Sequence, residues 1–204
     1  MNIGILCGII FFNIFNNSLK KVFKATSWYK PDTLVDKLLD NVFVSGMHCY
    51  ICVFNIILYM FTLQQNYLDN AIIFSSSYYI YDLIRIVNNY HYNAYDNIYL
   101  LHHLVAICVL QYNILQYGIF YFIIGEFSNI FYYPVYYCNK LNTDVLTTRM
   151  LKKLQFISYF FCRVIIMSYY VYLTVLIETT PILIFTSPIY LMGVFWSYKL
   201  YLNL

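Results

Sequence analysis

Seven long apolar stretches, separated by polar segments, constrain the fold of this chain more than any other feature of its sequence. A helix needs about 20 predominantly apolar residues to cross the hydrocarbon core of a bilayer. The stretches that reach or approach this length are 2–16, 42–63, 70–87, 96–112, 115–137, 154–177 and 181–202. We therefore predict an all-α fold, a polytopic transmembrane helical bundle of about seven spans.

Composition excludes the main alternative, a soluble globular domain. Apolar residues make up 62% of the 204 positions and charged residues only 10%, against roughly 45–50% and about 25% in ordinary soluble domains. So few charges could not cover the surface of a soluble fold of this size. The net charge is only +3 and the basic residues are clustered, so we expect no nucleic-acid partner.

The first apolar stretch is short, and a signal peptide is its alternative interpretation. No Lys or Arg precedes the stretch, although a signal peptide begins with a positive segment, so we expect an uncleaved span. Residues 17–41 and 138–153 are the main polar segments and are predicted as loops. The chain then divides into residues 1–37, a hydrophobic span with a basic cytosolic loop, and a main domain of residues 38–204.

The distribution of basic residues predicts the orientation of the bundle. With seven spans, nearly all Lys and Arg side chains fall on one side of the membrane. These are Lys20, Lys21, Lys24, Lys30, Lys37, Arg85, Lys140, Arg149, Lys152, Lys153 and Lys199. The connections around 64–69, 112–115 and 178–181 contain no Lys or Arg. Basic loops stay cytosolic, so we predict a cytosolic C-terminus and a lumenal or exterior N-terminus.

Polar side chains inside the predicted spans are the main functional signal, because ionisable groups in a membrane are costly and mark functional sites by default. At a rise of 1.5 Å per residue, five spans place such side chains about 8–16 Å from the cytosolic surface. They are His48, Asp82, His102, His103, Glu126, Asn129 and Arg163. Glu126 and Asn129 share a face of the fifth span. We predict one inward-facing layer that forms a polar chamber open to the cytosol.

The charges of this predicted layer balance, with Asp82 and Glu126 against Arg85 and Arg163. Asp82 and Arg85 are three residues apart on one helix face, which Tyr78 joins one turn earlier. We expect pairing inside the bundle, because an unpaired charge is expensive there. The alternative is a structural polar network that only fixes helix packing, and Arg85 can instead extend its side chain to the interface.

The adjacent His102 and His103 point about 100° apart on a helix, so they cannot both face one point. A metal site from His48, His102 and a carboxylate is one alternative, but zinc sites on helices usually use positions four apart, and we assign no metal. The sharper hypothesis is a neutral histidine that acts as general base and is oriented by Asp82 or Glu126.

Cys49 and Cys52 form a Cys-x-x-Cys pattern inside an apolar segment. The sequence has no matching pair elsewhere. A redox or zinc role needs accessible thiolates or further ligands. We therefore interpret the two cysteines as neighbours on one helix face.

Several of these residues stand in stretches that resemble the TLC-domain family, named after the TRAM, LAG and CLN membrane proteins. The stretches are Ser77–Leu83, Leu101–Leu104 and Gly125–Asn129, with weaker support from Asn41, Ser45, His48, Phe160–Arg163 and Trp196. The resemblance covers about residues 38–203. It implies a six-helix TLC core around the polar chamber, in a lipid-handling protein of an internal membrane, commonly the endoplasmic reticulum.

One branch of that family, the ceramide synthases, joins fatty acyl-CoA to a sphingoid amine around a His-His centre. This chain shares His102 and His103 with the synthases. The next helix of the synthases carries a His-Asp…Asp pattern, and here Gly125–Asn129 takes its place. The chain therefore looks more like the non-synthase branch, which is linked to lipid sensing, trafficking and membrane composition.

Three hypotheses for function follow. The first is a TLC-type protein of lipid metabolism or homeostasis whose partners are membrane lipids. The second is an acyltransferase with acyl-CoA as co-substrate, in which His102 or His103 is the base, Asp82 orients it, and Arg163 or the cytosolic lysines hold acidic groups. The third is a small-solute or ion transporter, although the chain has no internal repeat. The predicted substrate-binding residues are His48, Tyr78, Glu126, Asn129 and Arg163.

Overall fold

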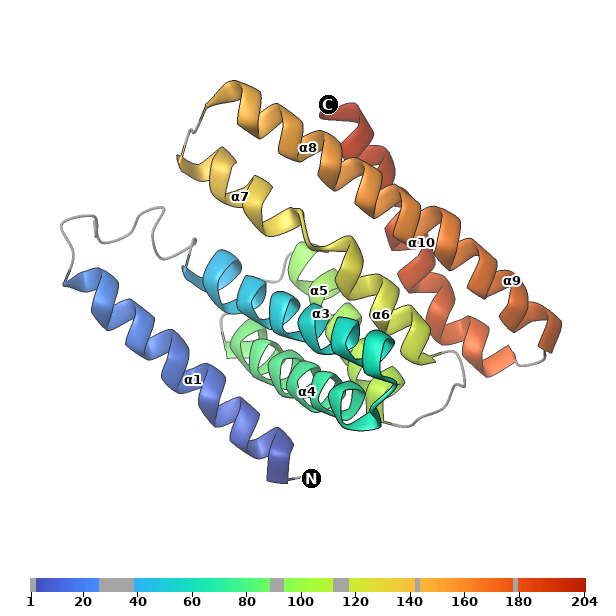
Figure 1. Ribbon diagram of the computed structural model, residues 1–204, viewed down its shortest axis with the longest axis horizontal. Helices are drawn as coiled ribbons and strands as arrows, with labels where there is room; N and C mark the ends of the chain where they lie inside the picture. The colour runs from blue at the N-terminus through green and yellow to red at the C-terminus, as the bar shows by residue number, and fades with distance from the viewer. Residues whose placement is uncertain (1–2, 26–38, 89–93, 112–117, 142–143, 178–179) are drawn as a thin grey trace. The chain divides into compact units, whose positions relative to one another are not determined.

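The computed structural model describes residues 3–25, 39–88, 94–111, 118–141, 144–177 and 180–204, and this part of the chain is helical almost throughout (Figure 1). It divides into two compact units, Met1–Leu104 and Val105–Leu204. The helix α5, Ala94–Gln111, begins in the first unit and continues into the second. The all-α prediction is confirmed.

The first unit is built on three helices that pack along one another. They are α1 (Ile3–Lys24), α3 (Ser45–Thr62) and α4 (Gln65–Asn88), and a π-helical segment η1 (Leu39–Val44) leads directly into α3. The helix α4 contacts both α1 and α3, and in Figure 1 these helices run side by side. The polar side chains of the predicted spans 42–63 and 70–87 therefore meet within this unit.

A tight turn joins α3 to α4. Leu63 follows α3 with a φ of 55°, in the left-handed region, and its backbone N–H donates to the carbonyl of Tyr59 at 2.7 Å. A single left-handed residue of this kind ends a helix by satisfying one of its last carbonyls. The turn lets α4 start at Gln65 and run back along α3.

Small side chains line the buried face of α4. Ala71 and the run Ser75–Ser77 are completely buried. Small residues let membrane helices approach closely, which increases their van der Waals contact. Gly8 of α1 packs against this face. A Cβ at that position would overlap the side chain of Ser77, so glycine allows the close approach. The polar Ser75–Ser77 run is therefore part of a helix interface.

The second unit contains the remaining helices. They are α6 (Gly118–Ser128), α7 (Tyr132–Leu141), α8 (Val145–Phe160), the π-helical segment η2 (Phe161–Ile166), α9 (Met167–Ile177) and α10 (Thr180–Leu202). The segment η2 joins α8 to α9 and contacts α6 and α10. In the second unit, Tyr121, Ile124 and Met167 form a buried apolar cluster where α6 meets α9.

The predicted span 115–137 is not one continuous helix. It breaks at 129–131 between α6 and α7, and Asn129 lies in this turn, where its N–H donates to the carbonyl of Glu126 at 3.0 Å. Pro134 explains the break. A proline has no N–H to donate and its ring clashes with the carbonyl four residues earlier, so it favours the first turn of a helix, although Pro188 lies inside α10. Pro134 is the third residue of α7.

The loop predictions were partly wrong, because helices extend into both polar segments. The helix α1 continues to Lys24, and Lys21 and Lys24 lie in its last turn, where cations favour the negative end of the helix dipole. At 138–153, α7 ends at Leu141 and α8 begins at Val145. Charged residues near a membrane surface are good helix formers, and hydropathy alone did not reveal this.

The fold agrees with a membrane protein. Among the described residues, three helical stretches are long and apolar enough to cross a bilayer: Ile3–Lys24, Val42–Thr62 and Val145–Leu176. Many large apolar side chains on these helices are exposed, for example Ile3, Phe61 and Leu176. Lipid is the solvent that suits such a surface, so the chain is an all-α membrane bundle.

Candidate functional site

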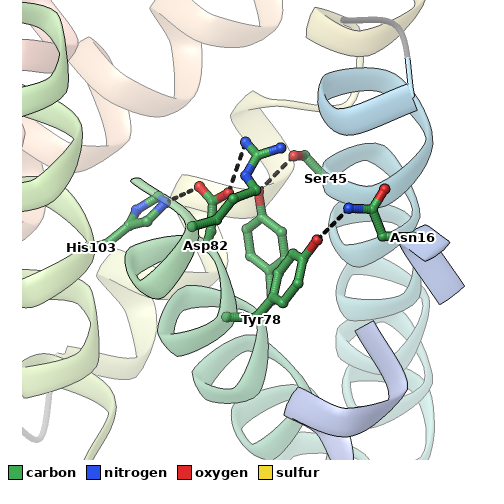
Figure 2. Close-up of polar contacts among 7 residues, drawn as sticks. Asn16, Ser45, Tyr78, Asp82 and His103 are labelled. Atoms are coloured by element: carbon green, nitrogen blue, oxygen red, sulfur yellow. Dashed lines mark hydrogen bonds and ion pairs between the residues drawn. The ribbon is translucent and has the colours of Figure 1, made fainter. Parts of the chain in front are cut away.

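A buried histidine–carboxylate pair lies where α5 meets α4 (Figure 2). The Nε2 of His103 is 2.7 Å from the Oδ2 of Asp82, and both residues are buried. The Nη2 of Arg85, one turn along α4, is 3.0 Å from the other carboxylate oxygen of Asp82. Both oxygens of Asp82 are therefore engaged, one by a buried imidazole and one by a partly exposed guanidinium.

This geometry decides which nitrogen of His103 can act as a base. An ionised Asp82 only accepts hydrogen bonds, so the proton of a neutral His103 belongs on Nε2. The lone pair of Nδ1 is then unprotonated. Among the described residues, Nδ1 is buried and has no hydrogen-bond partner. A histidine held by a carboxylate through one nitrogen and open at the other has the arrangement of a positioned general base.

His102 lies in different surroundings from His103. The residue is partly exposed although its Nδ1 is buried, and its ring centroid lies 6.4 Å from that of Tyr79 and 5.6 Å from that of His103. This agrees with the expectation that adjacent helical residues diverge by about 100°. Of the two histidines, His103 is the one that Asp82 orients.

His48 is the centre of a second polar group, at the interface of α3 and α4. Its Nε2 is 2.8 Å from the Oγ of Ser75, which in turn lies 2.9 Å from the Sγ of Cys52. The ring of His48 stacks on Tyr78, with centroids 4.1 Å apart and an angle of 14° between the planes. His48 is almost fully buried, with 2% of its surface exposed. The hydrogen bonds and the stacking together fix the orientation of the imidazole.

Tyr78 and Tyr79 connect His48 with His103. The hydroxyl of Tyr78 donates to the Oγ of Ser45 at 2.6 Å, as Figure 2 shows. The ring of Tyr79 lies 5.4 Å from His48 and 5.3 Å from His103, centroid to centroid. The first unit therefore holds one continuous polar and aromatic cluster rather than isolated polar residues.

Several members of this cluster were not predicted. Ser45, Cys52 and Ser75 make hydrogen bonds within it, and Asn16 of α1 donates to the hydroxyl of Tyr81 at 2.7 Å (Figure 2). The available signal was the Ser75–Ser77 run in an apolar stretch, where buried hydroxyls need partners. The prediction gave weight mainly to ionisable groups and passed over serine and cysteine side chains.

Arg163 is the corresponding buried polar residue of the second unit. Its Nε donates to the Oγ of Ser128 at 2.8 Å, and its Nη2 donates to the carbonyl of Gly125 at 3.3 Å. The sequence predicted a balance of charges that included Arg163 and Glu126 without assigning them to each other, and the hydrogen bonds of Arg163 are with neutral groups. Gly125 and Ser128 lie three residues apart on one face of α6, whereas Glu126 points about 100° away from Gly125. Glu126 is itself buried, with 3% of its surface exposed.

The predicted shared face of Glu126 and Asn129 is also interrupted, because α6 ends at Ser128. The predicted site residues thus fall into two groups within separate units. His48, Tyr78, Asp82 and His103 lie in the first, and Glu126, Asn129 and Arg163 lie in the second. The proposal that all of them form a single layer stays a prediction.

Two further observations bear on ligands, one about metal ions and one about a cavity. No group of three His, Cys, Asp or Glu side chains among them is placed to hold a metal ion. In the second unit, a cavity of about 340 Å³ lies at the ends of α7, α8 and α10. It is lined by Cys138, Asn139, Val145, Thr148, Arg149, Lys152, Asn203 and Leu204. Arg149 and Lys152 make this cavity basic.

The fold and the buried groups define a class, the polytopic helical membrane proteins with ionisable side chains inside their spans. Comparison with known families gives a closer assignment: the family model for the TLC domain matches residues 37–202. The chain belongs to the TLC-domain family of membrane proteins, which is linked to lipid biology. Neither the curated proteins nor the solved structures contain a significant match to the chain.

Proposed function

We propose that this TLC-domain protein binds a membrane lipid at its buried polar groups and acts in lipid metabolism, lipid sensing or membrane lipid homeostasis. One observation carries the proposal: the Asp82–His103 pair, joined at 2.7 Å and buried between helices of a membrane protein. Ionisable residues in such a place are expensive and mark functional sites by default. Membership of a family linked to lipid biology makes a lipid the first ligand to test.

A purely structural polar network is the competing explanation. Buried polar networks that serve packing are normally satisfied in full, because each unsatisfied group costs the free energy of its desolvation. His103 departs from this rule, since its Nδ1 is buried and has no partner among the described residues. A ligand hydroxyl or amine that donates to Nδ1 would remove this cost, and this favours a binding role.

The experiment measures lipid retention by the full chain in nanodiscs. The protein is purified with a cellular lipid extract and the lipids that remain after washing are identified by mass spectrometry. We expect one lipid class to be enriched over the extract, and His103→Ala to reduce the enrichment at least about tenfold. His102→Ala, at the neighbouring position, is the matched control and should retain it. No enrichment in the unchanged protein would contradict the proposal.

A second candidate function, acyl-CoA-dependent acyl transfer to a lipid, is favoured by the open Nδ1 of His103. In that reaction a lipid amine or hydroxyl attacks the thioester carbonyl while Nδ1 accepts its proton. The new amide or ester bond forms as the carbon–sulfur bond breaks, and coenzyme A leaves as a thiolate that takes up the proton. Asp82 would hold the imidazole in the required tautomer and stabilise its protonated form.

Acyl transfer is tested in the same nanodiscs with labelled long-chain acyl-CoA and a panel of amine and hydroxyl lipids. A labelled lipid product that disappears in both His103→Ala and Asp82→Asn would support the enzyme. If His102→Ala abolishes the product and His103→Ala does not, the assignment of the base is wrong. Lipid retention without turnover would leave binding as the function, and ion flux through liposomes would favour a transporter.

A further inference from the structure

Arg163 occupies an unusual position for a charged residue. It lies within the apolar helical stretch Val145–Leu176, which is long enough to cross a membrane, and only 6% of its surface is exposed. The backbone around it is the π-helical segment η2, Phe161–Ile166. Short π-helical segments inside α-helices are rare and occur frequently at functional sites.

The contacts of Arg163 are all with neutral groups. It donates to the hydroxyl of Ser128 and to the carbonyl of Gly125. Its Cζ lies 5.4 Å from the centre of the Tyr159 ring. Within the described part of the chain, Asp82 forms its ion pairs with Arg85 and His103, and Arg163 forms no ion pair. The guanidinium is therefore held in place without a counter-charge.

The two hydrogen bonds leave the charge and most of the donors of Arg163 unused. A guanidinium has five N–H donors in a rigid planar fork, of which Ser128 and Gly125 take two. Neutral acceptors do not compensate a buried charge, and an uncompensated charge is strongly destabilising. The arrangement suits an anion that arrives from outside the chain.

The surroundings also restrict where such an anion comes from. The guanidinium lies directly against α6 on one side, because a Cβ built on Gly125 would be in ordinary contact with the Nη2 of Arg163, at 3.6 Å. The flanking surface of α8 and η2 is apolar and exposed, for example at Ile157, Phe161 and Ile165. An amphiphile can lay its acyl chain on this surface while its headgroup reaches Arg163. A small hydrophilic anion has no apolar part that this surface could bind.

We infer that Arg163, held by Ser128 and Gly125, binds the anionic headgroup of a lipid, a carboxylate or a phosphate. The planar guanidinium matches the geometry of either group and can bind two of its oxygens. The inference rests on the proposed function in one respect, that the ligand is a lipid. It adds that the lipid is negatively charged.

The test compares lipids that differ only in headgroup charge. The full chain in nanodiscs of phosphatidylcholine is titrated with oleate and with oleyl alcohol, and separately with phosphatidic acid and with diacylglycerol of the same acyl chains. We expect one anionic member to bind at least about tenfold more tightly than its neutral partner, as charge-assisted hydrogen bonds imply. Acetate and inorganic phosphate should not compete. If they displace the lipid, the site takes free anions and the lipid assignment is wrong.

Three variants link the charge preference to Arg163. Arg163→Gln should abolish the preference, and Arg163→Lys should retain part of it because it keeps the charge without the planar fork. The control is Lys153→Gln, which removes the same charge from an exposed position on α8 outside the lining of the basic cavity and should leave the preference intact. A preference that survives Arg163→Gln would overturn the inference.

The inference and the proposed function fail in distinguishable ways. If the unchanged protein binds the charged and neutral lipids equally, the inference is overturned and lipid binding stands. If it binds none of the four lipids and retains none from the extract, both are overturned. Because these outcomes use the unchanged protein, they hold even if Arg163→Gln does not fold.

Discussion

Asp82 connects two basic side chains that differ in exposure. His103 is buried, whereas the side chain of Arg85 is 28% exposed. An ion pair near the surface gains little, because water screens the charges and the long side chain loses conformational freedom. Breaking a buried charged hydrogen bond costs much more, since the group left behind stays desolvated. The two partners of Asp82 should therefore contribute unequally to stability.

The first prediction measures this difference. Asp82→Asn should lower the free energy of unfolding by about 1–3 kcal/mol, because it removes the charge that both His103 and Arg85 face. Arg85→Ala should cost less than about 1 kcal/mol. Unfolding in mixed detergent micelles, followed by circular dichroism, gives both values. Equal losses in the two variants would show that the pair with His103 has no special weight.

At the scale of residues, the sequence predicted a pair within one helix and did not specify the contacts between helices. Asp82 and Arg85 pair as expected, because a separation of three residues on one helix specifies a contact directly. The sequence assigned no specific partner to Arg163, whose hydrogen-bond acceptors in the structure are Ser128 and Gly125. Contacts between helices depend on rotation about their axes, which spacing along one helix does not determine.

Helix α1 shows how elements of this fold are held together. Its buried residues Ile5, Phe12 and Asn16 recur at spacings of seven and four, which places them on one face. This face packs on α4, where the ring of Phe12 lies 5.4 Å from that of Tyr78. Gly8 belongs to the same face and meets Ser77. The two helices cannot separate without losing these contacts. A larger side chain at Gly8 would push them apart and so tests the interface.

The second prediction is that Gly8→Leu separates α1 from α4. A leucine side chain cannot fit against Ser77, whose own hydroxyl donates to the carbonyl of Ile73 at 2.7 Å. Overpacking of this kind costs about 1–3 kcal/mol. Ile14→Leu, at an exposed position on α1, is the control. Crosslinking between cysteines introduced into α1 and α4 should weaken in Gly8→Leu, and unchanged crosslinking would contradict the interface.

The third prediction concerns the start of α8 and depends on pH. The side chain of Asp144 accepts a hydrogen bond from the backbone N–H of Thr147 at 2.8 Å and so caps the helix. This backbone hydrogen bond lowers the pKa of Asp144 below its usual value. Because the folded pKa is depressed, the cap is complete above the unfolded pKa of about 3.9 and is lost as the pH falls through the lower, folded value.

Amide hydrogen exchange in the first turn of α8 measures this cap. Protection should decrease as the pH is lowered below about 3.9, after correction for the intrinsic exchange rate. Asp144→Ala should show weak protection at every pH, because no side chain accepts the hydrogen bond. Asp144→Asn should keep the protection and lose its dependence on pH. A pH dependence that persists in Asp144→Asn would assign it to another group.

At the scale of the whole molecule, hydropathy predicted the class and missed details that depend on local chemistry. The apolar runs were enough for an all-α membrane bundle, because lipid forces every spanning segment to satisfy its own backbone hydrogen bonds. The break at 129–131 and the short connection between Leu141 and Val145 come instead from Pro134 and from the cap at Asp144. Neither residue changes the mean hydropathy of its segment appreciably.

The asymmetric distribution of Lys and Arg supports the last prediction, that the C-terminus faces the cytosol. In the described part of the chain, the turn between α3 and α4 at Leu63–Gln64 has no basic residue nearby, whereas Arg149, Lys152 and Lys153 lie on α8. Basic segments are retained in the cytosol during insertion. The turn and the basic end of α8 should therefore lie on opposite sides of the membrane.

Glycosylation in microsomes distinguishes the two sides, because only sequences in the lumen are modified. A tag with an Asn-x-Thr site and flexible flanks is placed after Leu204 in one variant and between Leu63 and Gln64 in another. We expect modification of the tag at the turn, and a C-terminal tag that stays unmodified and open to added protease. Modification at the C-terminus would invert the orientation. The buried groups of α4 and α5 would then lie nearer the lumen. Since acyl-CoA is supplied from the cytosol, this orientation would argue against acyl-CoA as the co-substrate.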